Sequence, residues 1–232
     1  MKRWMLFVLA SLVAASVLVG CGDDDDDAAA DVDVAAFCDG YFDLNAGEPT
    51  ADKIRDVAAD APQAAKAPME AIATGFEDQG GDYTDSEEFG QQYEAVTKVA
   101  ADECADDNIA VLASEYKFDG IPSEVDAGVV AATFENKGAE MHEIIVLRKK
   151  DGVEESFDDI LAKDQEEAEK FVDISFGAFG PPGATSTALF DMRKGGEYVA
   201  VCFIPVGSTP DNEDAEGPPH FTQGMKTEFT VG

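Results

Sequence analysis

The sequence predicts two domains, a small α-helical bundle followed by an all-β Greek-key sandwich with one helical insertion. Residues 35–104 are rich in alanine and carry apolar residues at helical spacing. The segment that follows consists of short apolar or alternating runs separated by turn residues, which is typical of strands. An apolar stretch and a run of aspartates come before both parts. We therefore expect segment boundaries at 1–20, 21–34, 35–107 and 108–232.

The first twenty residues have the layout of a secretory signal. Lys2 and Arg3 precede an apolar stretch over residues 4–19, and small residues lead to Cys21. An uncleaved membrane anchor is the alternative, because the stretch is nearly long enough to span a bilayer. The segment Leu18-Val19-Gly20-Cys21 resembles the lipobox of bacterial lipoproteins. This resemblance implies cleavage before Cys21, a lipid on the Cys21 thiol, and a protein anchored to the outer face of the bacterial cytoplasmic membrane.

The charge of the chain limits its partners. Sixteen basic and 49 acidic residues give a formal net charge of −33. Such a surface repels nucleic acid, so we expect no nucleic-acid partner. The run Asp23–Asp27, within the lipid-anchored linker 21–34, is expected to act as a self-repelling spacer. The charge as a whole is explained most simply by solubility.

The expected bundle is divided by breakers at Gly47-Glu48-Pro49, Pro62, Pro68 and Gly80-Gly81. Its last helix is expected over 86–103, with a capping pattern around Ser86. The bundle contains no histidine and no phosphate-binding glycine loop. We therefore interpret it as a spacer or a docking module.

The four cysteines suggest different roles. Cys38 and Cys104 bracket the bundle and belong to a protein expected in an oxidising compartment, so a disulfide is predicted. Cys202 is left over. It is either a metal ligand or a small buried apolar residue.

The second half alternates short strands with turns. A basic and glycine-rich segment, Arg193-Lys194-Gly195-Gly196, indicates a hairpin between two of these strands. One amphipathic helix is expected as an insertion over 154–171. The expected strands are 110–118, 128–136, 143–148, 187–192, 197–204 and 226–231.

The only two histidines of the chain stand in a suggestive order with Cys202. His142 comes just before a strand, Cys202 ends a later one, and His220 is followed by Met225 before the last strand. This order resembles the cupredoxin family over residues 110–232. The resemblance implies one copper ion with His142, Cys202 and His220 as equatorial ligands and Met225 as the weak axial ligand.

Two features depart from the family pattern. Residues 203–219 separate Cys202 from His220, where the family usually has only a few. Because the cost of loop closure rises slowly with length, we expect this insert to bulge outward without separating its ends. Glu143 stands where many members have asparagine. It is expected to alter the surroundings of the ligands or to supply an oxygen ligand.

The resemblance implies a lipid-anchored copper protein for electron transfer or copper handling, working with an exported redox protein. The alternative is a metal-free interaction module, which would tolerate loss of Cys202 and His220. An enzyme is not expected. Two histidines are too few for multicopper oxidases or copper nitrite reductases, and no hydrolase or zinc-protease motif is present.

Overall fold

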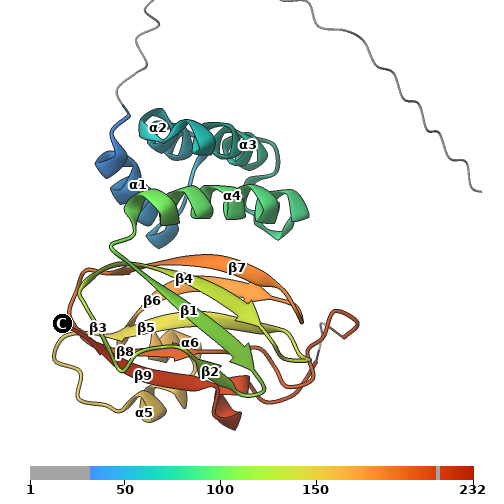
Figure 1. Cartoon of the computed structure of the whole chain (residues 1–232). Coiled ribbons are helices and arrows are strands. Elements are labelled where there is room, and N and C mark those ends of the chain that lie inside the picture. Colours follow the sequence, from blue (N-terminus) through green and yellow to red (C-terminus); the bar gives the residue numbers. More distant parts are fainter. Residues whose placement is uncertain (1–31, 213–214) are drawn as a thin grey trace, which may run out of the picture. The chain divides into compact units, whose positions relative to one another are not determined.

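The computed structural model describes residues 32–212 and 215–232, which contain a helical bundle followed by a β-sandwich (Figure 1). The predicted signal segment, the lipidation site Cys21 and most of the linker 21–34 lie outside these residues. Within the described part, no helix combines the length and apolar character needed to cross a membrane.

The bundle has four α-helices and one 3₁₀ turn. Thr50 and Ser86 cap α2 and α4 by accepting the backbone N–H groups of Lys53 and Phe89, so the predicted cap at Ser86 is confirmed. Pro68 lies inside a helix, not at an end. The elements are α1 (Val34–Ala46), α2 (Ala51–Asp60), α3 (Gln63–Gln79), η1 (Gly80–Asp85) and α4 (Glu87–Cys104).

The sandwich consists of two sheets. The four-stranded sheet has the order β2-β1-β4-β7, and the five-stranded sheet has the order β3-β9-β8-β5-β6. Both are mixed, since β1 pairs with β4 and β3 with β9 in parallel. The fold class predicted from the sequence is confirmed. The strands are β1 (Asp107–Ser114), β2 (Lys117–Asp119), β3 (Glu124–Val125), β4 (Gly128–Asn136), β5 (His142–Lys149), β6 (Val172–Gly180), β7 (Thr185–Met192), β8 (Gly196–Val201) and β9 (Lys226–Val231).

The four-stranded sheet is covered on both faces. Val129, Ala131 and Leu189 pack among the helices, whereas Val130 and Ala132 face the core between the sheets. Because β4 is buried on both faces, its sequence is almost continuously apolar and does not alternate between apolar and polar residues.

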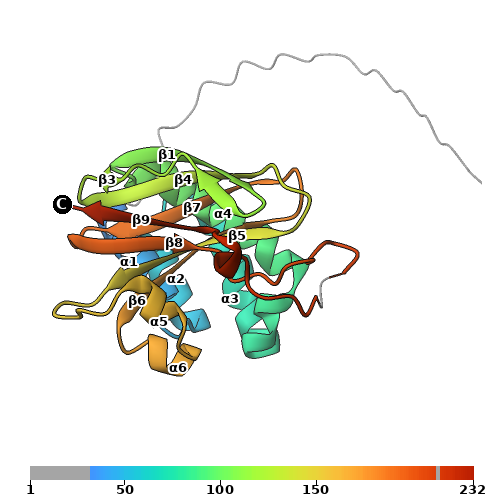
Figure 2. The ribbon, with the colours of Figure 1, turned by 90° about the horizontal axis from the view of Figure 1, so that it is seen from below.

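The five-stranded sheet is covered on its outer face by α5 (Phe157–Leu161), which packs against Leu147, Val199 and Val201. The short helix α6 (Gln165–Ala168) follows it along the chain (Figure 2). Because side chains alternate along a strand, Val199 and Val201 face α5 while Ala200 and Cys202 face the core between the sheets. This alternation turns Cys202 inward.

Three sequence-based expectations about the elements were wrong in detail. The insertion 154–171 is not one helix. It forms two helices, α5 and α6, because Ser156 and Asp164 each cap the N-terminus of one helix by accepting a backbone N–H. Residues 110–118 bend back as the antiparallel pair β1 and β2. The strand β6, which pairs with β5 over its length, was not expected.

The predicted hairpin at Arg193–Gly196 was also wrong. The strand before it, β7, pairs with β4 in one sheet, whereas β8 pairs with β5 and β9 in the other. The turn residues therefore carry the chain from sheet to sheet. Local sequence indicates the turn but not the partner of each strand.

The predicted disulfide between Cys38 and Cys104 is confirmed. It joins α1 to the end of α4 across a sequence separation of 66 residues. Closing so long a loop restricts the unfolded chain, which is the main way a disulfide stabilises a fold.

Replacing both Cys38 and Cys104 with serine should lower the free energy of unfolding by about 2–4 kcal/mol. Urea denaturation followed by circular dichroism measures this change. The wild-type protein treated with a reductant serves as a control and should lose a similar amount. Equal denaturation midpoints for wild type and variant would contradict the stabilising role.

Candidate metal centre

The four residues predicted as ligands are held by three segments of the sandwich. His142 begins β5, Cys202 directly follows β8, and His220 begins the 3₁₀ turn η2 (His220–Gln223). Met225 lies between η2 and β9. All four side chains have no solvent exposure. Period-two alternation accounts for His142, which shares the inward face of β5 with Ile144.

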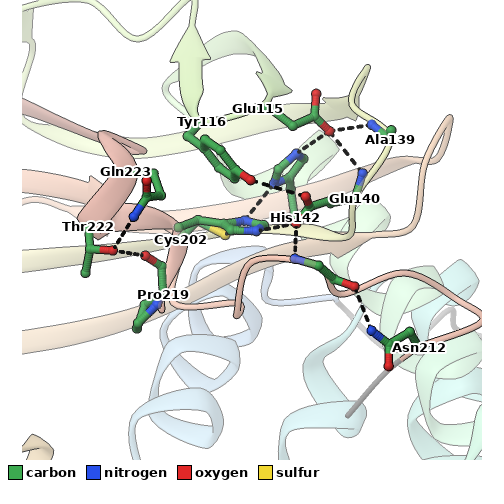
Figure 3. A network of polar contacts seen from close by, with 12 residues as sticks. Glu115, Tyr116, Ala139, Glu140, His142, Cys202, Asn212, Pro219, Thr222 and Gln223 are labelled. Carbon is green, nitrogen blue, oxygen red and sulfur yellow. Dashed lines mark hydrogen bonds and ion pairs between the residues drawn. The ribbon is translucent and has the colours of Figure 1, made fainter. Parts of the chain in front are cut away.

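The structure brings two imidazoles and a thiol together. Nδ1 of His142 lies 3.1 Å from Nδ1 of His220, and Sγ of Cys202 lies 3.4 Å from the same His220 atom (Figure 3). One ligand atom from each residue lies within 4.8 Å of the others. Among the described residues this is the group of histidine, cysteine and acidic side chains placed to share a metal ion.

Met225 is tied to the other segments through its main chain. Its N–H donates to the carbonyl of His220, and its carbonyl accepts from the N–H of Cys202, both at 3.2 Å. Its side chain lies in the same buried cluster as Cys202. The residue is thus fixed beside the cysteine and the second histidine.

The long segment 203–219 returns to its starting point, as the sequence analysis expected. His220 N–H donates to the carbonyl of Ile204, and Phe221 N–H donates to the carbonyl of Cys202, both at 2.9 Å. Pro205 and Pro219 form a β-bridge. These contacts close the base of the loop, so its length does not separate Cys202 from His220.

Glu143 does not join the metal-type group. Its Oε1 accepts the backbone N–H of Phe203 at 2.9 Å. The carboxylate therefore fastens the first ligand strand to the residue after Cys202, and burial raises the pKa of Glu143. Glu143 therefore belongs to the surroundings of the candidate ligands and does not supply an oxygen ligand.

Sequence reasoning missed two carboxylates around the imidazoles. Oε2 of Glu140 lies 3.0 Å from Nε2 of His220, and Oε1 of Glu115 lies 3.6 Å from Nε2 of His142 (Figure 3). Glu140 stands two residues before His142, which was the one available hint in the sequence. Glu115 comes from the turn between β1 and β2, so only folding brings it near.

The sequence analysis did not identify Asn136 as a support for His142. Its amide group donates to the carbonyls of Glu140 and Gly180 at 2.8 and 2.9 Å, and its Oδ1 accepts from Gly138 N–H. The side chain is fully buried. It fixes the loop that delivers His142.

Burial controls the protonation of the candidate ligands. It raises the pKa of Cys202 to about 12, so without a metal the thiol keeps its proton at neutral pH. Burial, with the neighbouring His220, lowers the pKa of His142, which favours its neutral form. A metal ion would bind a neutral imidazole and displace the proton of the thiol.

No protein-family model and no curated protein matches the chain. Solved structures resemble it in part. Dithionite-reduced auracyanin from the photosynthetic bacterium Roseiflexus castenholzii shares 23% identity, covering 54% of this chain and 96% of its own, with a TM-score of 0.34. Auracyanin A from Chloroflexus aurantiacus, a "blue" copper protein, shares 16% identity over 54% of this chain and 99% of its own, with a TM-score of 0.34. Rusticyanin from Thiobacillus ferrooxidans shares 16% identity, covering 54% of this chain and 77% of its own, with a TM-score of 0.31.

With such low TM-scores these similarities carry no argument about function. The second half of the chain is cupredoxin-like in its two-sheet sandwich and in the order of its buried histidine, cysteine, histidine and methionine.

Gly138 lies too close to the site to carry a side chain. A Cβ there would be 2.5 Å from Oε1 of Glu115 and 2.6 Å from Nε2 of His142. Gly138→Ala should therefore lower the free energy of unfolding by about 1–3 kcal/mol and weaken metal binding, because the buried ring must shift.

Urea denaturation and metal titration measure these effects. Gly90→Ala is the matched control, since a Cβ at that position of α4 meets nothing within 4 Å. The control should be neutral or slightly stabilising. Equal behaviour of the two variants would show that the approach of Gly138 to His142 does not matter.

Proposed function

We propose that the protein binds one copper ion through His142, Cys202, His220 and Met225, and that it transfers electrons. One observation carries this proposal. The Nδ1 atoms of two histidines and the sulfur of a cysteine outside any disulfide converge in the core between the sheets. Burying three such groups without a use for them would be costly.

The donor set fits copper. Two imidazoles and one thiolate with a weak thioether are the ligands of blue-copper electron-transfer sites. When bound, copper would supply a one-electron redox couple. The chain supplies a fixed cage, because backbone hydrogen bonds tie the segments of Cys202, His220 and Met225 to one another. A fixed cage changes little when the charge of the site changes.

Burial favours electron transfer over copper delivery. The four side chains have no solvent exposure, and a β-bridge between Pro205 and Pro219 closes the base of the loop 203–219. An electron can reach a buried site through the protein, whereas release of the ion requires the site to open to solvent. Copper handling is therefore the second candidate.

We further propose that the protein acts in the cell envelope, attached through a lipid on Cys21, with an exported redox protein as its partner. The residues before Cys21 support the lipid, although they lie outside the described part. The disulfide between Cys38 and Cys104 supports an oxidising compartment. Nucleic acid is not expected as a partner of so acidic a chain.

Titration of residues 31–232 with Cu(II), followed by visible absorbance and electron paramagnetic resonance, tests copper binding. We expect saturation at about one ion per chain and an intense visible band, because thiolate-to-copper charge transfer absorbs strongly. Cys202→Ser should abolish the band, since serine offers no thiolate. A band retained in Cys202→Ser would refute the ligand assignment, and absence of stoichiometric binding would leave the metal-free interaction module.

Met225→Leu should keep the visible band and shift the reduction potential, because the axial ligand tunes the potential without making the thiolate bond. Leucine preserves the volume of the buried side chain, so stability should change by less than about 1.5 kcal/mol. Redox titration of the copper-loaded protein measures the shift. An unchanged potential would remove Met225 from the ligand set.

A further inference from the structure

The two imidazoles of the site differ in what holds their outer nitrogens. Nε2 of His220 has a hydrogen-bond partner, Oε2 of Glu140, at 3.0 Å. Nε2 of His142 has none, because Oε1 of Glu115 lies 3.6 Å away. A carboxylate that accepts from the outer nitrogen of a histidine fixes the tautomer of the ring and raises the basicity of the inner nitrogen.

The carboxylate of Glu140 is itself fixed by several donors. Tyr116 Oη donates to its Oε1 at 3.2 Å, and Gly207 N–H donates to its Oε2 at 2.6 Å (Figure 3). Its side chain is only 17% exposed.

The main chain of Glu140 is held as firmly as its side chain. Its carbonyl accepts from the side chain of Asn136 at 2.8 Å, and its N–H donates to Oε1 of Glu115 at 3.0 Å. Through Gly207 the same carboxylate also fastens the long loop 203–219 to the loop before His142. A carboxylate oxygen held in this position accepts a hydrogen bond from His220 only when the proton of the ring is on Nε2.

We propose that Glu140 is the positioning residue of the metal centre: it holds the proton of His220 on Nε2, leaves Nδ1 free to bind the metal, and lowers the reduction potential of the site. This inference rests on the proposed copper-binding function. A negative charge hydrogen-bonded to a ligand ring favours the more highly charged oxidation state. Glu115 does not do the same for His142, since its Oε1 lies 3.6 Å from Nε2 and makes no hydrogen bond to it.

The first experiment is a redox titration of the copper-loaded protein. Glu140→Gln keeps an oxygen that can accept from His220 and Gly207 but removes the charge. At a fixed ambient potential we expect the variant to show about a tenfold higher ratio of reduced to oxidised protein than the wild type. This change is equivalent to a reduction potential raised by about 59 mV for a one-electron couple. A ratio that is unchanged or lower would overturn the effect on the potential.

Two control variants separate the hydrogen bond from charge alone. Glu115→Gln removes a charge that is near the other imidazole but not hydrogen-bonded to it, and should raise the ratio less than Glu140→Gln does. Glu216→Gln removes an exposed charge from the same long loop and should leave the ratio unchanged. Equal shifts for Glu140→Gln and Glu115→Gln would overturn the positioning role.

The second experiment needs no copper. Ring-nitrogen nuclear magnetic resonance reports the tautomer of each histidine, and a His142→Gln variant assigns the signals because the chain has only two histidines. We expect the proton of His220 on Nε2 in the metal-free protein. We expect Glu140→Leu, which offers no acceptor, to give a mixture of tautomers.

The two experiments distinguish this inference from the proposed function. Finding the His220 proton on Nδ1 in the metal-free wild type would overturn the positioning role even if copper binds. Failure to bind copper, with the proton on Nε2, would instead overturn the proposed function and the effect on the potential while supporting the tautomer assignment.

Discussion

The site depends on a small set of backbone hydrogen bonds at the base of a long loop. The carbonyl of Cys202 accepts from Phe221 N–H, and its own N–H donates to the carbonyl of Met225. Met225 N–H in turn donates to the carbonyl of His220. These bonds join the end of β8, the turn η2 and the start of β9 into one unit, so the rest of the loop can vary without moving the ligands.

The layers of the fold explain why this unit can be buried. The four-stranded sheet is covered by helices on one face and by the second sheet on the other, and α5 covers the second sheet from outside. Metal ligands placed between two such sheets are shielded from water. A dry and rigid surrounding suits a group that changes its charge but exchanges no atoms with solvent.

The acidic character of the chain has a local counterpart at the site. Among the many acidic residues, Glu115, Glu140 and Glu143 each make a specific hydrogen bond at the site. Glu140 contacts the imidazole of His220, and Glu143 accepts a hydrogen bond from the residue after Cys202. Glu115 accepts a hydrogen bond from the backbone of the loop before His142. Composition could not separate these three glutamates from the other carboxylates, because acidic residues occur throughout residues 23–232.

Local periodicity, residue type and spacing were enough to predict a helical bundle followed by a β-sandwich and the disulfide between Cys38 and Cys104. They also singled out His142, Cys202, His220 and Met225, which the structure buries. The pairing of the strands on either side of Arg193–Gly196, and the carboxylates that reach the imidazoles, became apparent only in the folded structure. Pairing of distant strands and the approach of Glu115 to His142 are set by how the layers pack, and no local pattern encodes contacts between residues that meet only on folding.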